Sequence, residues 1–196
     1  MSSIPTVIAF SGNIGAGKST LLRGLEAAGY EVVPEDFSRW GQLFEMALED
    51  PNRWKFSSQL KIMLTQSEIQ RDAKKSDSRV VVLERTTECV LDFCNVAMEQ
   101  GQILPAEHDM LAQIWEKVNV PVDAKIFLNT PPEKCMERIA FRGRAFERDI
   151  PVEYLSSLHS KFARDPDYIM SGLESKEVVL ANAIELIEKI VSRNVR

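Results

Sequence analysis

Short apolar runs rich in β-branched residues alternate along the chain with longer stretches in which apolar residues recur every three or four positions. The short runs have too few residues for a helix and are typical of strands buried on both faces of a sheet. They predict strands over residues 6–10, 31–33, 80–83, 125–128 and 178–180. The longer stretches predict helices over residues 17–29, 40–48, 51–75, 87–100, 107–118, 132–141, 152–162 and 183–191, and residues 164–175 are expected to form a loop.

The alternation of strand and helix predicts an α/β fold. It implies right-handed βαβ crossovers and therefore a parallel sheet of five strands with helices on both sides. The chain has 196 residues, of which 44% are hydrophobic. A chain of this length can bury a core without a disulfide or a structural metal. We therefore expect one domain over residues 1–196.

Charge and cysteine content narrow the classes of partner. Lys and Arg total 24 against 29 Asp and Glu, which gives a net charge of −5, whereas nucleic-acid binders usually carry a basic excess. No apolar run approaches the roughly 18 residues of a membrane span, and the N-terminal stretch resembles no secretory or mitochondrial signal. Cys89, Cys94 and Cys135 lack the spacing of a zinc site or a disulfide framework. We expect a cytoplasmic protein (in the host cytoplasm, if it is viral) with reduced thiols, which binds neither nucleic acid nor membrane.

Residues 12–19 read GNIGAGKS, which fits the pattern G-x-x-x-x-G-K-[ST] between a predicted strand and a predicted helix. Such a loop points backbone N–H groups at phosphate oxygens, and the helix N-terminus adds partial positive charge. Lys18 can reach the β- and γ-phosphates, and the Ser19 hydroxyl can ligate Mg²⁺. The predicted nucleotide contacts are Gly12, Asn13, Ile14, Gly15, Ala16, Gly17, Lys18, Ser19 and Thr20. The chain contains no D-x-x-G and no N-K-x-D, so a GTPase is not expected.

Two carboxylates and an arginine follow two other predicted strands. Glu35 comes after the second strand, and Glu84 and Arg85 come after the third. Ligands of parallel sheets lie beyond the carboxyl ends of the strands, so these side chains should meet near the γ-phosphate. One carboxylate could accept a proton from an acceptor hydroxyl and the other could serve Mg²⁺, while the arginine keeps both ionised. The alternative is a set of exposed residues at strand ends.

The segment ERIAFRGRAFERD is rich in arginine although the whole chain is acidic. Arg138 and Arg142 share a helix face, and Gly143 should end that helix and place Arg144 on a turn. Planar arginine donors beside a glycine hinge are what a lid over a triphosphate requires. We expect such a lid over about residues 138–149, and the alternative is a solvated charged helix face.

These motifs, taken in order, resemble the deoxyribonucleoside kinase family, which includes animal deoxynucleoside kinases and thymidine kinase-like enzymes of large DNA viruses. The matching strings are GNIGAGKST, PEDFSRW, DPNRWKFSSQ, ERTTECVLDFC and RIAFRGRAFERDIPVEYLSSLH, and the resemblance extends over nearly the whole chain. The resemblance implies a P-loop kinase fold, often dimeric through long helices. It also implies transfer of the γ-phosphate of ATP, with Mg²⁺, to the 5′-hydroxyl of a deoxynucleoside.

The resemblance also implies roles for single residues. Glu35 would act as the base on the 5′-hydroxyl and Arg85 would orient that group. Gln59 would pair with the nucleobase edge, Trp40 would pack at the nucleoside and Glu147 would bond the sugar 3′-hydroxyl. Ser19 and Glu84 would serve Mg²⁺, and the phosphates would be held by Lys18, Arg138, Arg142 and Arg144.

The expected substrate is thymidine and other pyrimidine deoxynucleosides. The Gln59 amide can flip to pair with either thymine or cytosine. Relatives that favour deoxycytidine and purines tend to carry an arginine and an aspartate near the exocyclic group of the base. Those positions are Gln66 and Val90 here, and Val90 would form an apolar wall for the methyl group of thymine.

Two departures and two rival functions accompany this interpretation. Leu48 stands where the family often has a tyrosine that bonds the 3′-hydroxyl, and Asp36 replaces the proline after the base carboxylate. A thymidylate kinase shares the phosphate loop and the arginine lid, but Glu35 would repel a monophosphate acceptor. A nucleotide-binding regulatory subunit without turnover would need no pairing of Glu35 with Arg85.

Overall fold

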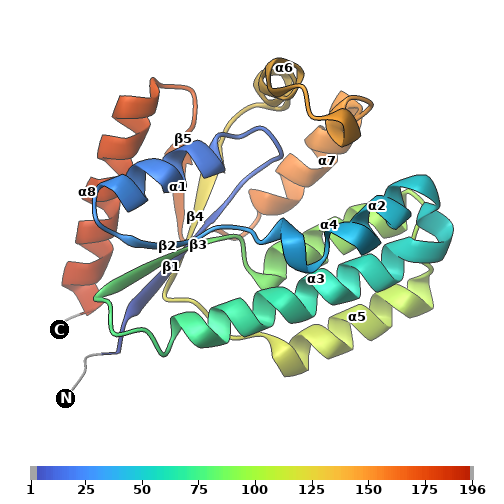
Figure 1. Ribbon diagram of the computed structural model, residues 1–196, viewed down its shortest axis with the longest axis horizontal. Helices are drawn as coiled ribbons and strands as arrows, with labels where there is room; N and C mark the ends of the chain where they lie inside the picture. Colours follow the sequence, from blue (N-terminus) through green and yellow to red (C-terminus); the bar gives the residue numbers. More distant parts are fainter. Residues whose placement is uncertain (1–3, 195–196) are drawn as a thin grey trace.

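Five parallel strands form a sheet in the order β2-β3-β1-β4-β5 in the computed structural model, which describes residues 4–194 (Figure 1). Because every pairing is parallel, the carboxyl ends of the strands lie at one edge. This confirms the predicted α/β fold with a five-stranded parallel sheet. The strands are β1 (Thr6–Ser11), β2 (Glu31–Val33), β3 (Val80–Glu84), β4 (Ala124–Asn129) and β5 (Tyr168–Ser171).

Helices cover both faces of this sheet (Figure 1). One face carries α1 (Lys18–Ala27) and α8 (Lys176–Asn194), and the other carries α3 (Pro51–Ala73), α4 (Thr87–Glu99) and α7 (Val152–Phe162). Helix α5 (Pro105–Val118) packs outside α3 and α4. The remaining short elements lie near the carboxyl edge: η1 (Phe37–Arg39), α2 (Gly41–Glu49), α6 (Pro132–Arg142) and η2 (Ala145–Glu147). No helix within residues 4–194 combines the length and apolar character of a membrane span.

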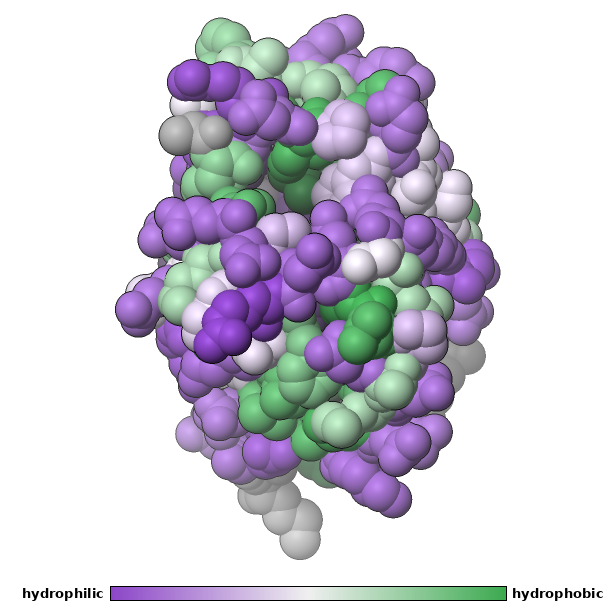
Figure 2. Space-filling view, turned by 90° about the vertical axis from the view of Figure 1, so that its right-hand side faces the viewer, coloured by the Kyte–Doolittle hydropathy of each residue, from purple (hydrophilic) through white to green (hydrophobic). Residues whose placement is uncertain are grey.

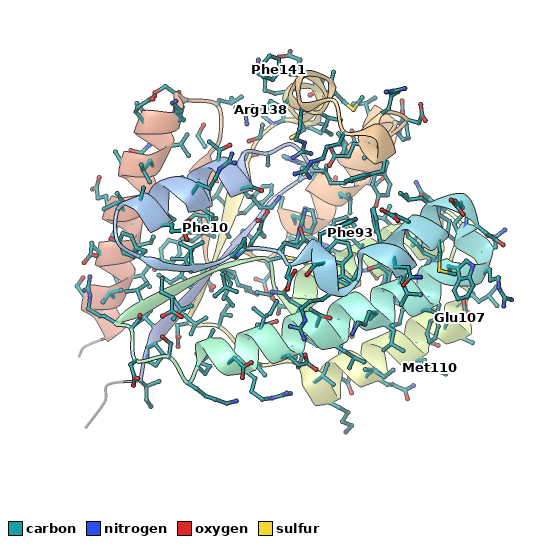
Figure 3. All side chains as sticks on the ribbon, in the orientation of Figure 1. Phe10, Phe93, Glu107, Met110, Arg138 and Phe141 are labelled. Atoms are coloured by element: carbon teal, nitrogen blue, oxygen red, sulfur yellow. The ribbon has the colours of Figure 1, made fainter. Side chains whose placement is uncertain are left out.

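The side-chain alternation of β1 divides the core into two layers. Ile8 and Phe10 pack in the cluster formed with α1 and α8, and Figure 3 shows Phe10 beside α1. Val7 and Ala9 point to the opposite face and pack in the cluster that contains Ala73 of α3. All four β1 residues are buried because helices cover both faces of this central strand. The phosphate-loop strand is therefore fixed from both sides.

The fifth strand lies at residues 168–171, inside the segment expected to be a loop, and the predicted strand over residues 178–180 is wrong. Those residues belong to α8, which begins after Ser175: the N–H of Val178 donates to the Ser175 Oγ at 3.3 Å. Val179 is buried on the helix face that also carries Ala183 and Ile187, so the apolar run follows a helical period. β5 was missed because it is an edge strand in which only Met170 is buried.

We expect the neighbouring valines of α8 to differ sharply in their effect on stability. Val179 is 7% exposed in the core and Val178 is 46% exposed. Val179→Ala should lower the free energy of unfolding by about 2 kcal/mol, because a buried valine side chain contributes on that order. Val178→Ala is the matched control and should change it by less than about 0.5 kcal/mol. Urea denaturation measures both, and equal losses would contradict the helical assignment.

Candidate active site

A cavity of about 1540 Å³ opens at the carboxyl edge of the sheet. Its walls come from the phosphate loop, the ends of β2 and β3, helices α2 and α3, and the segment around α6 and η2. Figure 2 shows the molecule hollowed between two halves, with hydrophobic side chains visible inside and hydrophilic ones around the rim. Pockets for one small ligand usually measure about 300–1000 Å³, so this cavity has room for two substrates side by side.

The phosphate loop joins β1 to α1 and places unpaired donors at the cavity. Gly12, Gly15 and Gly17 have φ values of 146°, 77° and 106°, which side chains other than that of glycine rarely adopt. A Cβ on Gly15 would also lie 2.6 Å from the carbonyl oxygen of Cys135. No side chain caps the N-terminus of α1, so its first N–H groups are free to bind an anion. Of the nine predicted contact residues, residues 14–20 line the cavity.

The other two predicted residues of the loop support it from behind. Asn13 is fully buried; its Nδ2 donates to the carbonyl of Leu155 at 2.8 Å, which ties the loop to α7. The carbonyl oxygen of Gly12 accepts from the Lys18 Nζ at 3.0 Å and from the Arg85 Nη1 at 3.2 Å. These two residues therefore shape the loop and its neighbours.

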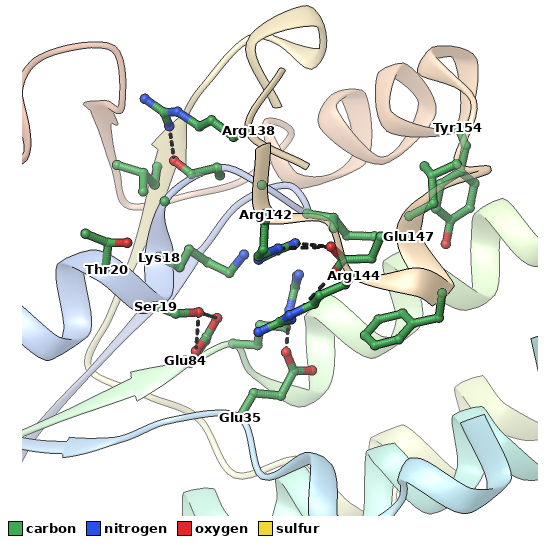
Figure 4. A pocket seen from close by; sticks show the side chains of 18 of the residues that line it. Lys18, Ser19, Thr20, Glu35, Glu84, Arg138, Arg142, Arg144, Glu147 and Tyr154 are labelled. Carbon is green, nitrogen blue, oxygen red and sulfur yellow. Dashed lines mark hydrogen bonds and ion pairs between the residues drawn. The ribbon is translucent and has the colours of Figure 1, made fainter. Parts of the chain in front are cut away.

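The carbonyl of Ala16 in the phosphate loop accepts two hydrogen bonds. Thr130 Oγ1 donates at 3.0 Å and Arg138 Nη1 at 2.8 Å, while Arg138 Nη2 donates to the carbonyl of Gly172 at 2.8 Å (Figure 4). In a planar trans peptide the N–H of Gly17 points opposite to this carbonyl. Arg138 was expected to hold phosphate directly, and in this structure its guanidinium holds the backbone of the phosphate loop.

Lys18 is a buried cation at the floor of the cavity. Its Nζ donates to the carbonyls of Gly12 and Asn13 at 3.0 and 2.9 Å. Burial, and next the positive charge of Arg85, lower the pKa of Lys18 to about 8, although Glu84 and Glu35 act in the opposite direction. The charge of Lys18 is thus incompletely compensated, and an anion that enters the cavity would compensate it.

The predicted strand-end residues come together beside Lys18 (Figure 4). Glu35 Oε2 lies 3.5 Å from Arg85 Nε, and the Ser19 hydroxyl lies 3.3 and 3.5 Å from the two carboxylate oxygens of Glu84. Burial opposes the charge on Arg85, yet Glu35 and its other anionic neighbours raise the Arg85 pKa above its ordinary value. The site therefore offers one carboxylate paired with arginine and a second carboxylate paired with a hydroxyl.

The second pair fits a magnesium ion that also binds substrate phosphates. Mg²⁺ prefers hard oxygen ligands and is usually held by one or two carboxylates together with phosphate oxygens. Ser19 and Glu84 provide a hydroxyl and a carboxylate within hydrogen-bond distance of one another. Among residues 4–194 no cluster of three or more acidic, histidine or cysteine side chains forms a metal site by itself, so substrate oxygens would have to supply the remaining ligands.

The arginine-rich segment closes over the other side of the cavity. Helix α6 ends at Gly143, whose φ of 69° is left-handed, as its sequence position predicts. Arg142 donates to Glu147 Oε2 from Nε at 3.0 Å and from Nη2 at 2.6 Å, and the Arg144 Nη1 lies 3.5 Å from Glu147 Oε1. Glu147 is 4% exposed, so the two arginines face a buried carboxylate within the same segment.

Four aromatic rings join this segment to the cavity wall formed by η1 and α2. Phe37 stacks on Phe146 with ring centroids 5.8 Å apart and packs edge-on against Trp40 at 4.7 Å. Phe44 contacts Phe37, Trp40 and Phe146 with centroid distances of 5.5–5.8 Å. Sequence analysis singled out Trp40 alone, because the other rings carry no local motif and meet only through the tertiary fold. In contrast, Phe141 at the tip of α6 points away from the molecule (Figure 3).

Gln59 presents its amide to the far end of the cavity. It is 4% exposed, and its Oε1 is buried with no hydrogen-bond partner among the described residues. Lys55 lies one helical turn earlier on α3 and lines the same cavity; burial lowers its pKa. Sequence analysis did not single out Lys55, although its spacing of four residues from Gln59 places both on one helix face. Leu48 also lines this region.

Val90 and the three cysteines lie away from the reacting groups. Val90 packs in the core formed by α3, α4 and α5, and it is absent from the described lining of the cavity. Its expected role as a wall for the base is therefore not visible in this structure.

Cys89, Cys94 and Cys135 are buried free thiols, and burial raises the pKa of each.

Comparison with known proteins relates this geometry to one family. The family model for deoxynucleoside kinases matches residues 8–190. A frog virus 3 (isolate Goorha) protein whose given name is that of a deoxynucleoside kinase is 97% identical over 194 residues, covering 99% of this chain and 100% of the viral protein. Deoxycytidine kinase 2 of Gallus gallus is 31% identical over 189 residues, covering 79% of this chain and 71% of the chicken protein.

A solved structure shows the same fold. Deoxyadenosine kinase from M. mycoides, described with the products dCMP and a flexible dCDP bound, matches with a TM-score of 0.83 and 21% identity, covering 94% of this chain and 100% of that chain. Because the family model spans nearly the whole chain and includes the phosphate loop, both strand-end carboxylates and the arginine-rich segment, this chain belongs to the deoxynucleoside kinase family.

Proposed function

We propose that this deoxynucleoside kinase transfers the γ-phosphate of ATP to the 5′-hydroxyl of pyrimidine deoxynucleosides. The observation that carries the proposal is the contact between Glu35 and Arg85, 3.5 Å apart, in the same cavity as Lys18 and the free N-terminus of α1. The phosphate loop would bind the donor, and the carboxylate would meet a hydroxyl. A carboxylate at that place disfavours a monophosphate acceptor, because like charges repel.

In this mechanism Glu35 accepts the proton of the 5′-hydroxyl and Arg85 orients the same oxygen. Phosphoryl transfer depends mainly on positioning and charge stabilisation, so the proton leaves late and a carboxylate within hydrogen-bond reach suffices. Lys18 stabilises charge on the transferred phosphate from the floor of the cavity. Ser19 and Glu84 would hold Mg²⁺, which when bound neutralises charge on the phosphate oxygens.

The arginine-rich segment would act as a lid over the donor. Arg142 and Arg144 exchange their contacts with Glu147 for phosphate oxygens, because a triphosphate is the stronger acceptor of charge-assisted hydrogen bonds. The released Glu147 carboxylate is then free to bond the sugar 3′-hydroxyl, as the family resemblance implies. Gly143 supplies the backbone freedom for this change.

Gln59 offers the base a hydrogen-bonding partner. Its unpaired Oε1 needs a donor, and thymine and cytosine, like the purines, offer a donor beside an acceptor on their pairing edge. Among the relatives, the Xenopus laevis, Gallus gallus and Mus musculus proteins are named deoxycytidine kinases. Gln66, at one of the two positions where relatives that favour deoxycytidine and purines tend to carry a charged residue, donates its amide to a backbone carbonyl instead of lining the cavity.

The proposal includes a cytoplasmic homodimer. Apolar side chains on the outer helices support dimerisation: Leu64 of α3 is 40% exposed and Met110 of α5 is 51% exposed. Figure 3 shows Met110 on the outer side of α5, away from the sheet. Apolar surface of this kind on long neighbouring helices suits a partner subunit.

Replacing Lys18 should separate activity from stability. Lys18→Met should lower the rate of phosphoryl transfer on the order of 10²–10³-fold, the usual effect of removing a charge-stabilising contact. The pKa of Lys18 is lowered to about 8 when folded. The lysine of the unfolded chain, with its ordinary higher pKa, therefore holds its ammonium proton more tightly than Lys18 of the folded protein does. Below about pH 8 this difference lowers the free energy of unfolding, because the folded protein must keep a buried charge. Thermal unfolding at pH 7 should show no loss of stability, and an active or unfolded variant would contradict the assignment.

Replacing Glu35 should affect turnover more than affinity. Glu35→Gln keeps the shape of the side chain but cannot accept a proton, so kcat should fall on the order of 10²–10⁴-fold while KM for the nucleoside changes little. Glu31→Gln, at the start of β2 and outside the cavity lining, is the control and should leave kcat unchanged. Steady-state kinetics of ADP release measure both variants. An unaltered kcat for Glu35→Gln would move the base role to another group, with Glu84 the next candidate.

The base preference can be measured with the four natural deoxynucleosides and with thymidine monophosphate. Thymidine and deoxycytidine should have the highest kcat/KM, and thymidine monophosphate should not be phosphorylated. Gln59→Leu should lower kcat/KM for the pyrimidines by about 10-fold or more, because their polar edge would then lack a partner. Gln42→Leu, at an exposed glutamine of α2, is the control. A preference for purines would contradict the proposed specificity and leave the kinase assignment intact.

A further inference from the structure

Arg85 is held in a backbone conformation that its residue type disfavours. Its φ is 69°, and it is the only residue other than glycine with a positive φ between residues 4 and 194. An arginine in this region pays a conformational cost and stays there only when its surroundings determine it. The strain lies at the residue proposed to orient the acceptor hydroxyl, so the contacts that maintain it bear on the reaction.

Contacts from three directions fix this residue. Its N–H donates to the carbonyl of Phe10 at 3.0 Å, which extends the pairing of β3 with β1. Its guanidinium donates to the carbonyl of Gly12 and lies over the rings of Phe93 and Phe162, 4.9 and 5.5 Å from their centroids. None of these contacts involves the carbonyl of Arg85 itself.

Gln66 of α3 makes the contact with that carbonyl. Its Nε2 donates to the carbonyl oxygen of Arg85 at 2.9 Å, and Gln66 is only 5% exposed. One turn later, Gln70 Oε1 accepts from the N–H of Thr87 at 2.8 Å. Two buried glutamines on one helix face therefore hold residues 85–87 by their backbone.

We propose that Gln66 is a positioning residue for phosphoryl transfer, which holds Arg85 in its strained conformation so that the guanidinium stays beside Glu35. The inference rests on the proposed role of Arg85. A donor is required at this place, because an apolar side chain would leave a buried carbonyl without a partner. Serine is too short to replace the long amide side chain.

The test is a double-mutant cycle on kcat, made with Gln66→Leu, Arg85→Lys and the combination of both. Gln66→Leu should lower kcat about 10- to 100-fold, since displacement of a reacting group by about 1 Å has effects of that size. KM for the nucleoside should change much less. In the Arg85→Lys background the same substitution should lower kcat by less than about threefold, because a residue that acts through another adds little once the other is lost.

Ser67→Ala is the matched control. Ser67 is also buried on α3 and also donates to a backbone carbonyl, that of Val118, which lies away from the cavity. Both Gln66→Leu and Ser67→Ala should lower the thermal unfolding midpoint, and only Gln66→Leu should lower kcat. If Gln66→Leu does not fold, Gln66→Glu, which keeps the shape without a donor at neutral pH, takes its place in the cycle.

The outcomes separate this inference from the proposed function. If Gln66→Leu lowers kcat by the same factor in the native and in the Arg85→Lys background, the positioning role is overturned. A native kcat for the Gln66→Leu single variant would overturn it as well. If Arg85→Lys alone keeps the native kcat, the proposed role of Arg85 fails and the inference fails with it. A large loss for each single variant, with no further loss in the double variant, supports both.

Discussion

Two buried cations at one edge of the sheet, Lys18 and Arg85, impose the arrangement of everything around them. Each is about 5% exposed, and the charge of Arg85 contributes to the lowered pKa of Lys18. Buried like charges are costly unless anions and carbonyls surround them. The chain supplies Glu35, Glu84 and the carbonyl of Gly12, and the phosphates of a nucleotide would supply the remaining negative charge.

The parallel sheet makes this concentration of charge possible. β1, β3 and β2 lie side by side, so the phosphate loop, Arg85 and Glu35 arise at the same edge although they are far apart in the chain. The apolar alternation within the strands places two helical layers on the faces and leaves only this edge open to the cavity. The packing of helices on both faces of the sheet thus confines the charged side chains of the cavity to the carboxyl edge of the strands.

Sequence alone predicted the parts of the site that depend on local spacing. The phosphate loop, the carboxylates after β2 and β3 and the glycine that ends α6 are all encoded by neighbouring residues. The fifth strand was misplaced because an edge strand buries one side chain, Met170, while the start of α8 carries a run of apolar residues. The contact of Gln66 with Arg85 joins residues 19 positions apart, and no local pattern encodes a side chain that binds a distant backbone carbonyl.

The stack of Phe37 on Phe146 couples two segments of the cavity wall. One ring belongs to the segment that follows β2 and the other to the segment that follows α6, so lifting either segment exposes aromatic surface on both. Aromatic pairs contribute about 0.5–1.5 kcal/mol each beyond the area they bury, and Phe146 also contacts Phe44. The ring contacts therefore hold the two segments together before any nucleotide arrives, and a ligand that displaces one segment must either carry the other with it or break these contacts.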